Sequence, residues 1–336
     1  MAKYRLAISI PTYNRADCIN LMLKEIIETA EKNDIGVYIF DGSPNDETQK
    51  VCEKYNTYSC LNYIKQTGDI KERHWEAVTA TDCDYLWICR DRSIIKSEFY
   101  EIILRLLDEN YDIYILTDIT YCVDKQVKII KSPCDLFKEY ILCMTLFGSY
   151  ILKKEALKAT DDSIEAEYYK YFALLAKTFQ GIANKKDFKA LFVPFDYKQN
   201  NFIIPNTSII KPEKLFDIWG DNWIAMIEDL PSCYDEYKEL AKHARDIDFW
   251  KFYTLLDFRM HGSLDLSSVL KHRKSIKQVA STPFFLFLFA SIIPQKLVKP
   301  FVKIFKPITN IFESIWNKIS KEINNAKKSL LKKKKI

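Results

Sequence analysis

Three short polar segments hold residue types that could bind or transform a charged ligand. Pro11–Arg15 (PTYNR) follows an apolar run, Asp41–Asp46 (DGSPND) follows a second run, and Arg90–Ser93 (RDRS) follows a third. Their carboxylates can accept N–H groups or hold a divalent cation, and their guanidinium groups can pair with phosphate. We interpret the three segments as parts of one site if the fold brings them together.

The elements that would position these segments alternate between strand and helix patterns. We expect strands at 5–10, 36–40, 61–64, 84–89 and 112–116, and helices at 17–31, 47–55, 71–81 and 96–108. This alternation predicts an α/β fold with a doubly wound, mostly parallel sheet. Ligands of such sheets bind in the loops that follow the carboxyl ends of strands, which is where all three segments lie.

Several function classes lack their motifs. The chain has no GxxxxGK[ST] phosphate loop, no GxGxxG after the first strand and no GxSxG, which disfavours an ATPase, a dinucleotide oxidoreductase and a serine nucleophile. The nine cysteines form no CxxC pair and have no ligand-like spacing with histidine, so we expect buried thiols rather than zinc. Asp82–Asp84 reads DxD, but it precedes its strand, and we interpret it as a surface pair. We expect no signal peptide.

The first two segments, taken in order, resemble the opening of the family 2 glycosyltransferases, which have the GT-A fold. The resemblance covers roughly residues 1–260. It implies that Asp41 accepts the imide N–H of the uracil base of an activated sugar, and that Pro11, Tyr13 and Arg15 line the base and ribose. A turn without a ligand is the alternative interpretation.

In that family the third segment holds a cluster of aspartates, whose last carboxylate binds a divalent metal that bridges the diphosphate. Here only Asp91 remains, between Arg90 and Arg92. The resemblance implies either Mn²⁺ or Mg²⁺ on Asp91, or two arginines that pair with the diphosphate directly. Lys71 and Arg73 match the family region that contacts the donor, with a solvated helix start as the alternative.

An inverting transfer needs a general base for the acceptor hydroxyl. The resemblance places this base at the start of a helix, expected at 165–179, that follows a strand expected at 145–150. The acids in this stretch are Asp161, Asp162, Glu165 and Glu167. We favour Glu165 or Glu167; acids that only stabilise a helix N-terminus are the alternative.

The net charge of +5 is unevenly distributed. Residues 295–336 hold twelve lysines and two glutamates, a charge of +10, so the first 294 residues carry −5.

The C-terminal segment also has a periodic apolar pattern. Apolar residues recur three or four apart from Leu297 to Ile323, a basic amphipathic pattern typical of helices that lie in a membrane surface. The apolar run Pro283–Pro294 is too short to span a bilayer. We expect 279–336 to bind an anionic membrane, with a packed helix and solvated basic end as the alternative, and we expect no nucleic acid.

The sequence thus suggests three parts: a nucleotide-sugar-binding GT-A domain at 1–210, a helical subdomain at 211–278 and a basic amphipathic tail at 279–336. Trp219 and Trp223 lie four apart, and we interpret them as aromatic packing, with a sugar platform as the alternative.

The resemblance implies an inverting glycosyltransferase of the hexosyltransferase type, peripheral on the cytoplasmic side of the cell membrane. It would move a sugar from a nucleotide sugar, UDP-linked, to a polyprenyl-diphosphate-linked saccharide in bacterial capsule or surface-polysaccharide synthesis. A catalytically impaired, nucleotide-sugar-binding partner subunit and a nucleotidyltransferase are the alternatives. The sequence does not indicate the oligomeric state.

Overall fold

The computed structural model describes residues 2–117, 126–160, 163–194, 201–203 and 212–300. Its contacts divide the chain into two units, which are described separately. Met1–Thr207 with Asn222–Ala244 form the first, and Ser208–Asp221 with Arg245–Ile336 form the second. The ranges expected from the sequence differ from this grouping, because two helices of the expected helical subdomain belong to the first unit.

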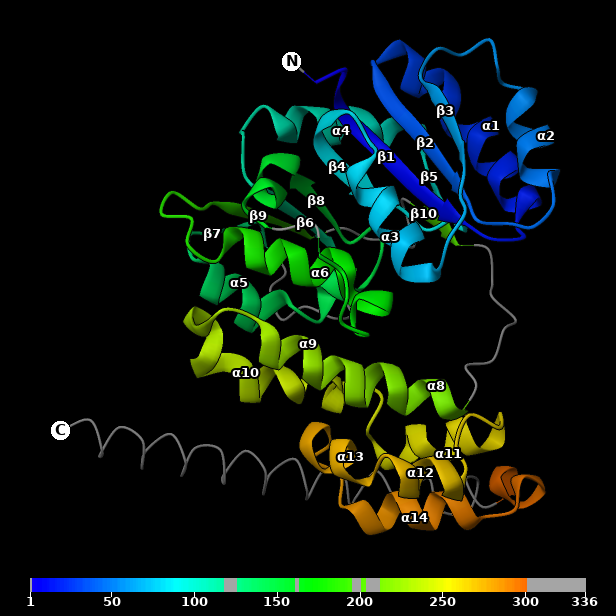
Figure 1. Ribbon diagram of the computed structural model, residues 1–336, viewed down its shortest axis with the longest axis vertical. Coiled ribbons are helices and arrows are strands. Elements are labelled where there is room, and N and C mark those ends of the chain that lie inside the picture. Colours follow the sequence, from blue (N-terminus) through cyan, green and yellow to red (C-terminus); the bar gives the residue numbers. More distant parts are fainter. Residues whose placement is uncertain (1, 118–125, 161–162, 195–200, 204–211, 301–336) are drawn as a thin grey trace. The chain divides into compact units, whose positions relative to one another are not determined.

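The first unit contains an eight-stranded sheet in the order β3-β2-β1-β4-β8-β6-β9-β7 (Figure 1). The strands are β1 (Tyr4–Thr12), β2 (Ile35–Asp41), β3 (Leu61–Lys65), β4 (Cys83–Ile88), β6 (Ile113–Thr117), β7 (Lys128–Ile130), β8 (Tyr150–Lys153) and β9 (Ala190–Pro194). Strand β1 is parallel to β2 and β4, and β2 is parallel to β3, whereas β8 is antiparallel to its neighbours β4 and β6. The predicted α/β fold with a mostly parallel sheet is confirmed.

Helices follow the strands of this sheet. They are α1 (Ala16–Lys32), α2 (Glu47–Glu53), α3 (Ile70–Thr79), α4 (Ser97–Leu107), α5 (Pro133–Tyr140), α6 (Tyr169–Ile182), α9 (Trp223–Asp229) and α10 (Asp235–Lys242). A second, two-stranded sheet pairs β5 (Ser93–Ile95) with β10 (Asn201–Ile203). The strands and helices expected up to residue 116 are all present, with ends shifted by a few residues at most.

The alternation of side chains along β1 explains how helices cover both faces of the sheet. Ile8 and Ile10 are buried in a core that also contains the apolar side chains of α1, such as Ile19. Ser9 points the other way, where its hydroxyl donates to the carbonyl oxygen of Ala77 in α3 at 2.6 Å. The period of two in a strand therefore places α1 on one face and α3 on the other.

Two expected elements begin later than the sequence suggests. The strand expected at 145–150 begins only at Tyr150, because Gly148 adopts a φ of +89° and donates its N–H to the Ile88 carbonyl at 2.6 Å. The helix expected at 165–179 begins at Tyr169, so Glu165 and Glu167 precede α6. Asp82 and Asp84 flank Cys83, the first residue of β4, at the sheet edge opposite to the three polar segments.

The second unit is helical. Its helices are α8 (Pro212–Phe216), α11 (Phe252–Met260), α12 (Leu266–Lys271), α13 (Arg273–Val279) and α14 (Phe284–Ile292). Buried Phe216 stacks on Trp250 with ring centroids 5.9 Å apart, and Phe287 packs on both rings. Within the described residues, no helix is long and apolar enough to cross a membrane.

The two tryptophans singled out in the expected helical subdomain both pack against protein groups. Trp223 is fully buried, and its indole N–H donates to the Ala241 carbonyl at 3.1 Å. The ring of Trp219 lies under the guanidinium of Arg245, at 3.8 Å from carbon to ring centroid. These contacts support aromatic packing over a sugar platform.

Candidate functional site

The three polar segments meet at the carboxyl edge of the sheet. Thr12, the last residue of β1, donates its hydroxyl to Asp91 Oδ2 at 3.1 Å, and its carbonyl accepts the Gly42 N–H at 3.1 Å. Asn14 adopts a φ of +54° and donates its N–H to Ser43 Oγ at 2.8 Å. The segment after β1 therefore bonds directly to the segments after β2 and β4, because these strands are its parallel neighbours.

Asp41 is the most enclosed group of the site. Its side chain is fully buried; Oδ1 accepts the Ser43 N–H at 2.9 Å, and Oδ2 accepts the Tyr63 hydroxyl at 2.9 Å. Lys65 Nζ lies 3.4 Å from Oδ2. Burial and this hydrogen bond to Asp41 raise the pKa of Tyr63, so its hydroxyl stays protonated as a donor. In this conformation Asp41 holds the loop, and a ligand reaches its carboxylate only if the loop opens.

Tyr13 and Arg73 lie together above Gly42. Arg73 Nη1 donates to the Gly42 carbonyl at 2.9 Å, and its guanidinium lies 5.4 Å from the centroid of the Tyr13 ring. A Cβ atom at Gly42 would lie 2.2 Å from Arg73 Nη1, so this approach needs glycine. The Tyr13 side chain is 53% exposed and offers its ring to solvent. An exposed aromatic ring beside a fixed guanidinium suits a planar base.

Helix α3 also reaches the two favoured acids. Its first turn is fixed by Asp69, whose side chain accepts the N–H groups of Lys71 at 2.7 Å and Glu72 at 3.0 Å. Lys71 Nζ lies 3.2 Å from the Glu165 carbonyl oxygen and 3.4 Å from Glu167 Oε1. The structure therefore brings Lys71, Glu165 and Glu167 together. Of the other acids of that stretch, Asp161 and Asp162 lie outside the described residues.

Asp91 is paired with Arg15. Arg15 Nη1 lies 2.8 Å from Asp91 Oδ1 and 3.1 Å from Oδ2, and the Thr12 hydroxyl bonds the same Oδ2. Asp91 is only 4% exposed. Arg92 is near this pair: burial, and then the charges of Arg15 and Arg90, lower its pKa.

The donor set around Asp91 does not fit the divalent metal that the sequence analysis assigns to it. Mg²⁺ and Mn²⁺ need several oxygen ligands. Both oxygens of Asp91 are already engaged, and arginines flank it on either side in the chain. Within the described part of the chain, no group of three or more His, Cys, Asp or Glu side chains could hold a metal ion.

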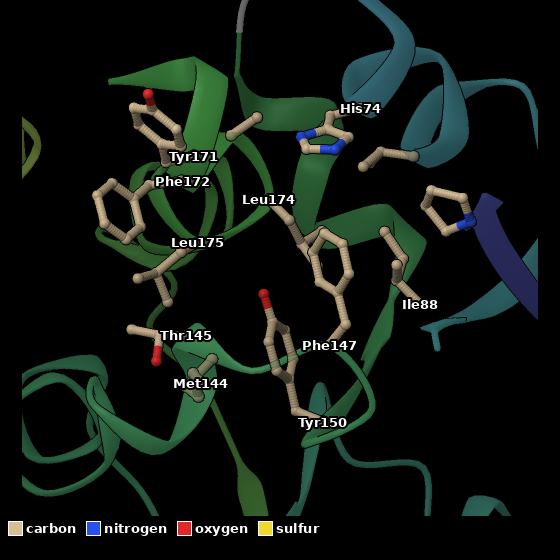
Figure 2. A pocket seen from close by; sticks show the side chains of 13 residues that line it. His74, Ile88, Met144, Thr145, Phe147, Tyr150, Tyr171, Phe172, Leu174 and Leu175 are labelled. Carbon is tan, nitrogen blue, oxygen red and sulfur yellow. The ribbon is translucent and has the colours of Figure 1, made fainter. Parts of the chain in front are cut away.

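Two cavities adjoin these groups. The first, of about 20 Å³, has room for about one water; it is lined by Pro11, His74, Phe147 and apolar side chains of α6 (Figure 2). Burial lowers the pKa of His74, whose ring meets Phe147 edge-on at 5.9 Å between centroids. Pro11 thus lines an apolar cavity that is too small for a sugar.

The second cavity is an open polar cleft of about 470 Å³. Its lining residues are Thr160, Ser163, Glu165, Ala166, Tyr168, Tyr169, Gln180 and Asp229. The Tyr168 hydroxyl donates to Asp229 Oδ2. Hydroxyl, carboxylate and amide groups around an open cleft of this size suit a saccharide.

Sequence reasoning missed the partners of the two central aspartates. Tyr63 and Lys65 hold Asp41, and Thr12 holds Asp91. Tyr63 and Lys65 are two residues apart in β3 and therefore lie on the same face of the strand. Lys65 is also the residue that pairs with Asp41 in the strand register. This spacing at the end of the strand is the sequence signal that could have identified both partners.

Comparison with known proteins finds a family model that matches part of the chain. Residues 7–165 match the sequence model of the family described as Glycosyl transferase family 2. No curated protein matches the chain. Staphylococcus aureus TarS is a similar solved structure, with 13% sequence identity and a TM-score of 0.53 over 85% of this chain and 52% of that one. The chain thus spans about half the length of TarS, and this likeness shows the fold.

Two further structures are less similar. TarS 1–349 in complex with UDP-GlcNAc has 12% identity and a TM-score of 0.47, covering 88% of this chain and 92% of that one. The mannosyltransferase PcManGT from Pyrobaculum calidifontis, in complex with GDP-Man and Mn²⁺, has 13% identity and a TM-score of 0.44, covering 87% and 86%.

Proposed function

Because residues 7–165 match the model of glycosyl transferase family 2, we propose that the chain is an inverting glycosyltransferase that uses a nucleotide sugar, UDP-linked. The observation that carries the proposal is the meeting of Tyr13 and Arg73 above Gly42, at the sheet edge where the three polar segments converge. The base would stack on the exposed Tyr13 ring. Asp41, once its loop opens, would accept the base N–H.

In the proposed transfer, one of the two acids beside α3 is the general base. Glu167, or Glu165, takes the proton from an acceptor hydroxyl, whose oxygen then attacks the anomeric carbon of the donor sugar. The new glycosidic bond forms as the bond from that carbon to the diphosphate oxygen breaks. The nucleoside diphosphate leaves with the electron pair, and the configuration at the anomeric carbon inverts. Lys71 orients Glu167 for this role.

The acceptor in this proposal is a saccharide bound in the polar cleft near Glu165. Gln180 and Asp229 provide amide and carboxylate groups for its hydroxyls. We extend the proposal to a polyprenyl-diphosphate-linked saccharide of bacterial surface-polysaccharide or capsule synthesis, because a basic C-terminal segment would hold the enzyme where such a lipid lies.

A donor screen tests this function. Purified protein would be titrated with UDP-GlcNAc, UDP-glucose and GDP-mannose by calorimetry, and nucleoside diphosphate release would be measured with each. We expect a UDP-sugar to bind, and Tyr13→Ala to weaken its binding about tenfold because a base-stacking ring is lost. Tyr253→Ala is the matched control, since Tyr253 is an exposed tyrosine of α11 in the second unit. Equal effects of the two variants, or no binding of any donor, would refute the proposal.

The second candidate is a catalytically impaired partner subunit that binds the nucleotide sugar. The single carboxylate in the Arg90–Arg92 segment favours it, because the family places an aspartate cluster there. Donor binding without any nucleoside diphosphate release, over a panel of acceptors, would support this candidate against the first.

We also propose that residues 279–336 hold the protein at the cytoplasmic face of the cell membrane. The twelve lysines beyond residue 294 would each contribute about 1 kcal/mol near an anionic surface. Within the second unit, apolar side chains on and just after α14 are exposed: Phe285, Phe289, Ile292 and Leu297. One apolar surface and one basic segment make two membrane-binding signals.

A truncation after Pro300 should release the protein from anionic vesicles. This cut keeps α14 (Phe284–Ile292) in the protein. The helix is kept because its Phe287 is fully buried and packs on Trp250, so that removing it would disturb the core of the second unit. We expect the full chain to sediment with phosphatidylglycerol vesicles and not with phosphatidylcholine vesicles, and high salt to weaken this binding. The truncated chain should stay in the supernatant with its nucleotide affinity intact. Equal sedimentation of both chains would contradict the proposal.

A further inference from the structure

The loop that precedes β5 carries an unusual surplus of positive charge. Arg90 and Arg92 flank Asp91 in the chain, and Arg15 reaches Asp91 from the loop before α1. Arg15 pairs with this carboxylate, and Arg90 and Arg92 are its two neighbours in the chain. Burial lowers the pKa of Arg92, the charges of Arg15 and Arg90 lower it further, and the charge of Asp91 raises it. Such a cluster favours an anion as its ligand.

The contact between Arg15 and Asp91 leaves part of the guanidinium available. The bonds from Arg15 to the two Asp91 oxygens, at 2.8 and 3.1 Å, both come from Nη1. The Arg15 side chain is 37% exposed, whereas that of Asp91 is only 6% exposed. Asp91 therefore holds Arg15 from the protein side, and the Nε and Nη2 donors can reach a ligand from the solvent side.

A second contact fixes the carboxylate itself. The Thr12 hydroxyl donates to Asp91 Oδ2 at 3.1 Å, and Thr12 is the last residue of β1. The pair is thus tied to the central strand of the parallel half of the sheet. Arg15 also directly precedes the first turn of α1, a helix of 17 residues whose positive end adds to the same anion-attracting field.

From these contacts we propose that Arg15, positioned by Asp91 and assisted by Arg90 and Arg92, binds the diphosphate of the donor, and that the transfer needs no divalent cation. This inference rests on the proposed function, and it states which residues of that site bind the leaving group. A guanidinium matches two phosphate oxygens with two N–H donors. A divalent cation would instead have to displace Arg15 from the one carboxylate and then lie among three positive charges.

The inference assigns Asp91 a positioning role. Under it, Asp91 does not touch the donor; it keeps Arg15 in the orientation that meets the diphosphate. As the sugar–oxygen bond breaks, negative charge grows on the departing diphosphate, and the fixed guanidinium groups stabilise that charge without reorganisation.

Calorimetry with uridine and with UDP tests this inference. The protein would be stripped with EDTA and titrated with each ligand, with and without added Mn²⁺. We expect UDP to bind equally well in both conditions. Arg15→Gln should weaken UDP binding by about 10- to 100-fold, as expected for lost bonds to a charged group, and leave uridine binding unchanged. Arg15→Lys should bind UDP more tightly than Arg15→Gln but less tightly than the wild type. Lysine keeps the positive charge but lacks the paired N–H donors of a guanidinium group.

Asp91→Asn and a control complete the experiment. Asp91→Asn should weaken UDP binding by the same factor with and without Mn²⁺ and leave uridine binding unchanged, which a merely destabilised protein would not do. Arg5→Gln is the matched control: Arg5 pairs with Asp108 at 2.7 Å and lies at the opposite end of β1. It should change neither affinity.

The outcomes separate this inference from the function on which it rests. If Mn²⁺ strengthens UDP binding in the wild type and Asp91→Asn removes that gain, Asp91 is a metal ligand and the inference is overturned, while the proposed function stands. If neither uridine nor UDP binds in any condition, the nucleotide site itself is wrong, and the inference fails with it.

Discussion

Glu167→Gln should lower kcat by about 10²- to 10⁴-fold and leave the donor affinity nearly unchanged. The expectation rests on the position of Glu167 beside the donor-side helix. Its Oε1 lies 3.4 Å from Nζ of Lys71, in the same helix α3 that carries Arg73. The amide of glutamine keeps the shape of the side chain but cannot take the proton of the acceptor hydroxyl. Single-turnover transfer rates, with the donor Kd measured separately, would check this result.

Glu165→Gln is the matched control for this variant. Only the main-chain carbonyl of Glu165 bonds Lys71, and its side chain lines the polar cleft. We expect it to weaken acceptor binding, seen as a raised KM, with a smaller loss of kcat. The reverse order of the two kcat effects would assign the general base to Glu165. If both variants keep the wild-type kcat, neither acid is the base.

Asp41→Ala should lower the free energy of unfolding by about 2–4 kcal/mol and abolish nucleotide binding. The carboxylate is fully buried, and its removal leaves the Tyr63 hydroxyl and the Ser43 N–H without an acceptor. Each unsatisfied buried donor costs about 1–3 kcal/mol. Lys65 adds little, since its side chain is one-third exposed and can turn to water. Urea denaturation and a UDP titration of the folded variant would measure the two effects.

Two variants separate the contributions to this loss. Tyr63→Phe removes one donor and keeps the carboxylate, so we expect it to cost about 1 kcal/mol and to retain nucleotide binding. Asp46→Ala removes an exposed carboxylate that lies 3.5 Å from the same Lys65, and we expect almost no change in stability. An Asp41→Ala protein as stable as Asp46→Ala would show that the buried network does not hold the loop. Retained UDP binding would show that Asp41 does not serve the base.

The strands and helices up to residue 117 could be predicted because their patterns are local. The run IGVYIFD is nearly continuously apolar, a pattern typical of a strand that is covered on both faces of a parallel sheet. In the structure all seven residues of this strand, β2, are buried. In α1 the buried residues Ile19, Leu23 and Ile26 recur at helical spacing. The delayed start of β8 could not be predicted in this way, because the φ of Gly148 reflects its bond to Ile88 in a distant strand.

The sequence by itself determined the fold class and which three segments carry the polar groups, since apolar periodicity and strand-end loops depend on neighbours in the chain. Only the tertiary structure decided which partners those groups contact. Arg15 and Asp91 are 76 residues apart, and parallel pairing of β1 with β4 brings them within 2.8 Å. That contact engages the carboxylate that sequence analysis had assigned to a metal. A side chain's chemistry is local, but its protonation, orientation and free ligand positions depend on partners that only folding brings into contact.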